Sequence, residues 1–181
     1  PGLGGEVLRS HGATVQHQPG GEIFQALNTG VIDATEWVGP YNDLAFGFQQ
    51  AAQYYYWPGW HEPGTTIEAM VNKEAYANLP THLQTVIERA CQAANDDMLS
   101  EFTARNSAAL QTLLYKHQVQ LRRFPDEVLK SLGSAAAGVV EEIATADPLS
   151  KKVYDSFQKF RKESVSYTRI TEQAYADARA L

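Results

Sequence analysis

A long stretch without a strong helix breaker, from Pro80 to Val119, constrains the fold of this chain more than any other feature. A proline at a helix start is favourable, and the apolar residues that follow have the spacing of an amphipathic helix. They are Leu83, Val86, Ile87, Ala90, Cys91 and Ala94. A continuous helix of about 38 residues is ~57 Å long, which is more than one domain of this size needs. We therefore predict that this helix bridges two lobes, with Cys91 buried on its apolar face.

Short apolar runs elsewhere in the chain are typical of an α/β protein. Strands are predicted at 13–16, 31–34, 53–57, 65–72 and 119–124. Further helices are predicted at 22–27, 73–78, 125–146, 153–167 and 171–181. With 181 residues, 44% of them hydrophobic, the chain can bury one substantial core and form one domain or part of two.

The distribution of charge argues against binding to nucleic acid. The formal net charge is -6, and residues 1–80 hold eight acidic side chains but only two basic ones, Arg9 and Lys73. Aromatic residues gather in this acidic part, whereas a nucleic-acid site needs them beside basic residues. No apolar run approaches the ~20 residues of a membrane-spanning helix, and an anionic membrane surface is equally unsupported. The chain starts at Pro1 with a loop-like sequence, so we expect it to begin within a longer protein.

An aromatic cluster beside a loop rich in proline and glycine is the first candidate for a binding site. The loop spans 58–64, and all three tryptophans of the chain lie at or before it: Trp37, Trp57 and Trp60. Single aromatic residues usually pack in a core, but a group beside a structured loop is also typical of a pocket wall. The candidate ligand contacts are Trp37, Tyr41, Trp60 and His61. A lone histidine with no second ligand at helical spacing is, however, also typical of a hydrogen-bonded loop residue.

Two carboxylates lie in the same segments, Glu36 and Glu62, each at a predicted junction between a strand and a loop. In open α/β sheets the ligand crevice lies at the carboxyl ends of the strands. Two converging carboxylates with main-chain carbonyls form an oxygen-rich site for a hard cation such as Na⁺ or Ca²⁺. Two solvated glutamates remain the simplest alternative. A third interpretation is an acid and base pair for hydrolysis, although the sequence has no catalytic serine motif, phosphate-binding loop or dinucleotide fingerprint.

Several segments together closely resemble the periplasmic solute-binding proteins of TRAP transporters, the DctP-like family. The resemblance rests on Gly20-Gly21-Glu22-Ile23 through Leu27, on 30–40 with its Asp-Ala-Thr-Glu-Trp sequence, on Tyr54 to Gly64 with its Trp-His-Glu-Pro-Gly sequence, and on Leu79-Pro80. It runs along nearly the whole chain and is closest to the branch that binds 2-oxo and 2-hydroxy monocarboxylates together with a metal ion.

The resemblance implies a two-lobed α/β fold, like the type II periplasmic binding proteins, that closes over a pyruvate- or lactate-like ligand and delivers it to a membrane permease. It implies a binding protein in the periplasm rather than an enzyme. In that branch, a glutamate and the following tryptophan give the cation a carboxylate and a main-chain carbonyl, which correspond to Glu36 and Trp37. The loop glutamate corresponds to Glu62. The cation then contacts the ligand carboxylate and supplies the positive charge that this acidic segment lacks.

The resemblance also implies that this chain is the carboxyl-terminal half of such a protein. Family members are longer, and their carboxylate-clamping arginine precedes the segment that corresponds to Pro1-Gly2. Residues 1–72 would be part of the second lobe and the hinge, with the ligand and metal loops. Residues 73–181 would supply the bridging helix and the carboxyl-terminal helices. The branch further implies a possible homodimer through the helix at 171–181. The alternatives of a different class are an enzyme that uses Glu36 and Glu62 as acid and base, and a helical interaction module.

Overall fold

The computed structural model describes residues 2–60, 64 and 67–180, and the chain divides into two compact units. One unit consists of 1–15 with 127–181, and the other of 16–126. Within the described residues, no helix is long and apolar enough to cross a membrane.

The first unit is helical. It contains α1 (Gly2–Ser10), nearly all of α6 (Asp126–Ala144), α7 (Pro148–Ile170) and α8 (Glu172–Arg179). Val7 of α1 and Leu132 of α6 form its small core, with 2% and 6% of their surfaces exposed. His11 joins α1 to α6, because its Nε2 atom lies 2.8 Å from the Ser131 hydroxyl. Helix α7 begins at Pro148 because the Asp147 side chain accepts hydrogen bonds from the amides of Leu149 and Ser150.

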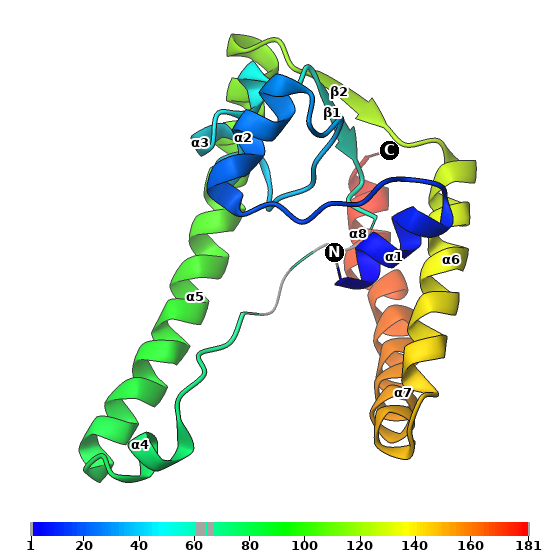
Figure 1. Ribbon diagram of the computed structural model, residues 1–181. Coiled ribbons are helices and arrows are strands. Elements are labelled where there is room, and N and C mark those ends of the chain that lie inside the picture. Colours follow the sequence, from blue (N-terminus) through cyan, green and yellow to red (C-terminus); the bar gives the residue numbers. More distant parts are fainter. Residues whose placement is uncertain (1, 61–63, 65–66, 181) are drawn as a thin grey trace. The chain divides into compact units, whose positions relative to one another are not determined.

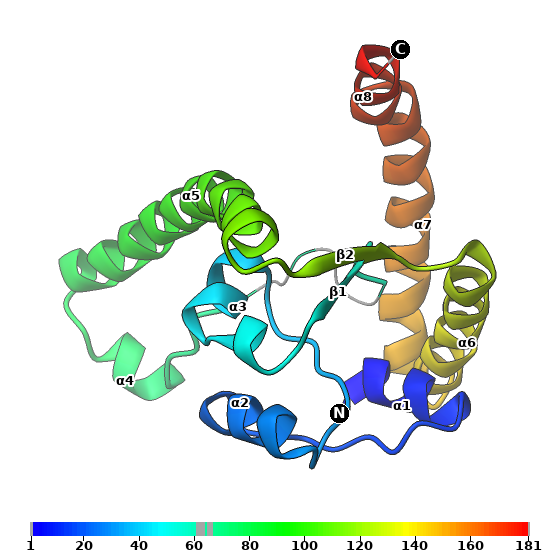
Figure 2. The same ribbon diagram turned by 90° about the horizontal axis from the view of Figure 1, so that it is seen from above.

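The second unit contains the long helix α5 (Thr81–Gln111), which continues as a π-helical turn, η2 (Thr112–Lys116). Its other helices are α2 (Gly20–Thr29), α3 (Pro40–Ala45), the 3₁₀ turn η1 (Phe48–Gln50) and α4 (Lys73–Ala77). Figures 1 and 2 show α3 beside the carboxyl-terminal end of α5 and α4 at its opposite end. The core of this unit includes Ile23, Ala26, Phe48, Ala109, Leu113 and Val119.

A two-stranded parallel sheet completes the second unit. Strand β1 (Tyr54–Trp57) pairs with β2 (Gln120–Arg123) in the register Tyr54 to Gln120 and Trp57 to Arg123. Parallel neighbours need a long crossover, and here the connection includes α4 and α5. The sheet therefore joins β1 to the part of the chain that follows α5 and η2.

The helices predicted from the sequence are confirmed, but the predicted strands at 13–16 and 31–34 are wrong. Both segments lack regular structure, and so do residues 67–72 of the predicted strand at 65–72, whose residues 65 and 66 lie outside the described part. A strand exists only where its backbone groups bond to those of a neighbouring strand. Within the described residues, these segments have no neighbouring strand. The predicted bridging role of α5 and the division at residue 72 stay predictions.

Candidate functional site

Residues 30–41, from the end of α2 to the first turn of α3, form a corner of the chain that carries Glu36, Trp37 and Tyr41. The indole of Trp37 packs within this corner. The Trp37 and Phe46 ring centroids are 5.3 Å apart. Gly20, the first residue of α2, allows the close approach of Trp37, because a Cβ atom there would lie 2.6 Å from the indole. A side chain at residue 20 would therefore displace the tryptophan. Trp37 stays partly exposed, at 37% of its surface.

Helix α5 holds the next residues of the corner. The Tyr41 backbone N–H donates to the Asn106 side-chain oxygen at 2.9 Å. Gly39 offers no side chain to cap α3, so Asn106 supplies the cap from a distant element. The Tyr41 ring meets Phe102 edge to face at 6.0 Å, and the Arg105 guanidinium lies 5.3 Å from its centroid. The corner is therefore fixed to the packed end of α5.

Strand β1 also contacts this region, through a hydrogen bond to Asp43 in the first turn of α3. The Tyr55 hydroxyl donates to Asp43 Oδ2 at 2.5 Å, and only 7% of the surface of Asp43 is exposed. Burial raises the pKa of the Asp43 carboxyl, and the nearby charge of Glu36 raises it further. The Tyr55 hydroxyl and the nearby amides of Val38 and Gly39 oppose that rise. Burial and the bond to Asp43 also raise the pKa of Tyr55.

After β1 the chain runs through a cis Trp57–Pro58 bond to Trp60, which is half-buried. Side chains of β2 and the residue after it contact β1. Arg123 lies 5.8 Å from the Trp57 centroid, and the Tyr56 and Phe124 centroids are 4.9 Å apart. His61 and Glu62, the other two predicted site residues of this loop, lie outside the described residues.

The structure thus places three of the predicted site residues in one corner: Glu36, Trp37 and Tyr41. Their roles in binding stay predictions. Asp43 and Asn106, which hold this corner, were not identified from the sequence. Asp43 is an ordinary acidic residue at a helix start, and Asn106 is 65 residues from its partner, so no local pattern marks either one.

The chemistry of the corner fits a hard cation. Within the described residues, no hydrogen bond takes up the main-chain oxygen of Trp37, and the Glu36 carboxylate lies near enough to Asp43 to raise its pKa. Carboxylate and carbonyl oxygens are the ligands that Na⁺ and Ca²⁺ take. The described residues contain no cluster of three or more histidine, cysteine, aspartate or glutamate side chains, and the third proposed ligand, Glu62, lies outside them.

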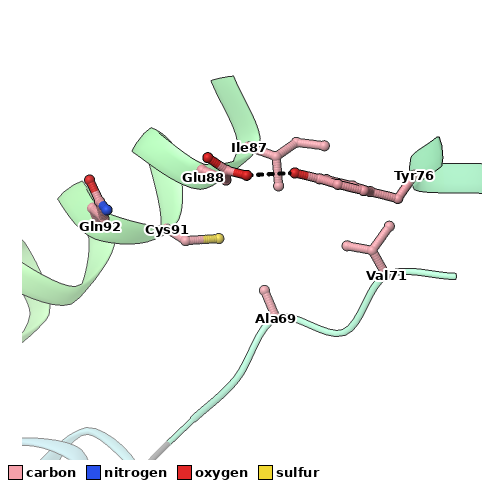
Figure 3. Close-up of a pocket in the computed structure, with 7 residues that line it drawn as sticks. All are labelled: Ala69, Val71, Tyr76, Ile87, Glu88, Cys91 and Gln92. Carbon is pink, nitrogen blue, oxygen red and sulfur yellow. Dashed lines mark hydrogen bonds between the residues drawn. The ribbon is translucent and has the colours of Figure 1, made fainter. Parts of the chain in front are cut away.

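An open, shallow pocket lies where the segment before α4 passes α5, at the opposite end of the helix from the corner (Figure 3). Its lining includes Tyr76, whose hydroxyl donates to Glu88 at 2.9 Å, and Cys91. Cys91 is exposed, so the prediction that it is buried is wrong. The apolar spacing identified the helix correctly, but in this structure little packs against that face.

A family model for bacterial extracellular solute-binding proteins, family 7, also called DctP, matches residues 1–147. The chain is 41% identical to the monocarboxylate 2-oxoacid-binding periplasmic protein of Nostoc sp., over 97% of this chain and 48% of that protein. The chain spans about half the length of the relatives it matches.

Two solved structures are similar across nearly the whole chain. A TRAP periplasmic solute binding protein from Colwellia psychrerythraea, with bound calcium and pyruvate, has a TM-score of 0.91 and 39% identity, over 98% of this chain and 54% of that one. Another from Pseudoalteromonas atlantica, with bound sodium and pyruvate, has a TM-score of 0.90 and 37% identity, over 98% of this chain and 54% of that one.

Proposed function

The chain belongs to family 7 of the bacterial extracellular solute-binding proteins, and we propose that it is part of the binding component of a TRAP-type transporter. In this proposal the complete protein captures a 2-oxo or 2-hydroxy monocarboxylate in the periplasm and delivers it to the membrane permease. The relative from Nostoc and the two pyruvate-bound structures support this class of ligand.

A cation bridges protein and ligand in the proposed site. Glu36 gives it a carboxylate oxygen, Trp37 a main-chain oxygen and Glu62 a second carboxylate. The observation that carries this proposal is the corner itself, in which the Trp37 carbonyl has no hydrogen bond from a described residue and Glu36 adds negative charge. Sodium and calcium are both candidates, because the two pyruvate-bound structures differ in this ion.

In this proposal the ligand is contacted by three aromatic residues and the loop histidine: Trp37, Tyr41, Trp60 and His61. An aromatic wall with a few polar groups is typical of a site for a small organic ligand. The alternative of an enzyme with Glu36 and Glu62 as acid and base has no support, since the relatives are binding proteins. A homodimer is a further part of the proposal, and a related structure from Bordetella bronchiseptica described as a dimer supports it.

Calorimetry of the complete protein, as its gene encodes it, tests this function. We expect pyruvate or lactate to bind with micromolar or tighter affinity only when Na⁺ or Ca²⁺ is present, and to be recovered unchanged. Replacing Glu36 and Glu62 by glutamine should weaken binding by roughly 100-fold or more, because two charged ligands are lost. Glu74→Gln, at the start of α4, is the matched control and should bind normally. Binding that needs neither cation nor glutamates would contradict the proposed site.

A further inference from the structure

Asp43 is the only charged residue that is buried in the described part of the chain. Burying an ionised carboxylate costs free energy unless its partners compensate, and buried titratable groups cluster at functional sites. Asp43 lies beneath the proposed cation corner, seven residues after Glu36. Its Oδ2 atom accepts the 2.5 Å hydrogen bond from the Tyr55 hydroxyl, and Oδ1 has no partner of standard geometry among the described residues.

Asp43 also lies close to the main chain that follows Trp37. The amides of Val38 and Gly39 lie close enough to the Asp43 carboxylate to lower its pKa. The backbone N–H of Asp43 also donates to the carbonyl oxygen of Gly39 at 2.9 Å. Asp43 is therefore joined through its main chain to the segment that follows Trp37.

Tyr55 links Asp43 to strand β1, which precedes the loop with Glu62 in the sequence. It lies in the middle of β1, opposite Leu121 of β2, and the chain leaves β1 two residues later for the loop that contains Glu62. One hydrogen bond thus joins the segment with Glu36 and Trp37 to the strand that leads to the other proposed ligand. Cation binding depends on ligand oxygens being held in place before the ion arrives, and outer contacts of this kind commonly do so.

The geometry points to Asp43 and Tyr55 as positioning residues of the cation site, which fix the corner that carries Glu36 and Trp37 to strand β1. This inference rests on the proposed function. Neither residue touches the ion or the ligand in it. The pair should therefore change how tightly the cation is held, and should do so through the ligands of the corner.

The test is cation affinity in the complete protein, measured by calorimetry with CaCl₂ and with NaCl at saturating pyruvate, for Tyr55→Phe. Losing one hydrogen bond that positions the ligands should weaken cation binding by about three- to tenfold. Tyr54→Phe is the matched control, because it removes the same hydroxyl from a neighbouring ring that is 51% exposed, and it should bind as the unaltered protein does. Thermal unfolding without ligand is recorded for each variant.

A purely structural role predicts a lower unfolding temperature for Tyr55→Phe with unchanged cation affinity, and that result would overturn the inference. A second comparison separates positioning from general weakening. If Tyr55 acts through the corner, adding Tyr55→Phe to Glu36→Gln should cost less affinity than Tyr55→Phe costs alone. Full additivity of the two losses would also count against the inference.

The two proposals fail in different ways. If Glu36→Gln binds the cation and pyruvate normally, the proposed cation site is wrong, and with it this inference. If Glu36→Gln loses binding while Tyr55→Phe and the unaltered protein bind alike, only the positioning role falls.

Discussion

The two ends of helix α5 have very different surroundings. At its carboxyl-terminal end, Asn106 caps α3, Phe102 meets Tyr41, and Ala109 is 5% exposed. Towards its amino-terminal end, Leu83 and Val86 are 40% and 59% exposed, and Leu99, near the middle of the helix, is 69% exposed. Within the second unit, the polar contacts there come from α4 and the turn after it, through Tyr76 to Glu88 and through Gln84 to two main-chain carbonyls.

This difference shows that the formation of a helix and its burial have different causes. Helix formation depends on local propensity and spacing, which are the same in kind along all of α5. Burial depends on which other segments lie against each turn. The candidate site lies at the end where other segments supply caps and ring contacts, so the packed end of α5 is the part of the helix that positions function. We expect the two ends to differ in energy as well as in contacts.

The largest difference should come from a matched pair of leucines. Leu113, in the π-helical turn, is 2% exposed, whereas Leu99 is 69% exposed. Replacing Leu113 by alanine removes buried methyl groups and leaves a cavity, which should lower the free energy of unfolding by about 2 to 5 kcal/mol. Leu99→Ala should change it by no more than ~0.5 kcal/mol. Urea denaturation of the complete protein measures both. Equal losses would show that another part of the protein covers Leu99.

Two asparagine caps give the next comparison. Asn106 caps α3 from another helix, and Asn72 caps α4 through the adjacent amides of Glu74 and Ala75. Asn106→Ala should cost about 1 to 2 kcal/mol of stability and Asn72→Ala about 0.5 to 1, because loss of the first also loosens the contact between two elements. Only Asn106→Ala should weaken cation binding in calorimetry. An equal effect of both variants on cation binding would contradict the idea that the packed, carboxyl-terminal end of α5 positions the site.

The sequence predicted the helices well because their signals are local. Pro80 before α5 and Pro125 before α6 are start signals that can be seen without any partner, and each helix begins next to its signal. The start of α7 was predicted too late, at residue 153, because the Asp147 cap at its true start was not used. The strands at 54–57 and 120–123 were also found. The segments at 13–16 and 31–34 have suitable composition but no bonded neighbour within the described residues, and composition does not reveal a neighbour.

For the site, the sequence identified residues by chemical type and resemblance, but it did not reveal what holds them. Glu36, Trp37 and Tyr41 stand close together in the sequence, so their grouping could be predicted. Asn106 and Tyr55 reach the corner only through the fold, by contacts across 65 and 12 residues. Their side chains have many ordinary uses, and a pattern in the sequence does not distinguish them from solvated polar residues.

A smaller effect, of opposite sign, is expected for Asp43→Asn. The pKa of Asp43 is raised in the folded protein above its ordinary value of 3.8, so the folded state binds its proton more tightly than the unfolded state does. The ionised form therefore costs stability, and the cost grows as pH rises through the folded pKa. Asparagine keeps an oxygen for Tyr55 without the charge, so its unfolding midpoint should exceed that of the unaltered protein at pH 7. The two midpoints should converge towards pH 3.

A lower midpoint for Asp43→Asn at pH 7 would contradict this account, since it would mean that the buried charge stabilises the fold. Cation affinity should fall in the same variant, because a negative charge near Glu36 is lost. Gain of stability with loss of binding is the combination expected when a buried charge serves the site rather than the fold.

The smallest effect is expected at the open end, for Tyr76→Phe. Its hydroxyl donates to Glu88 at 2.9 Å, and this bond raises the pKa of Tyr76. This bond is exposed to solvent near the pocket of Figure 3, so water replaces either group when the bond is lost. We expect the unfolding midpoint and the cation affinity to stay within experimental error, whereas Tyr55→Phe lowers the affinity. Because the two variants remove the same hydroxyl from a bond to a carboxylate, any difference between them comes from burial and location alone.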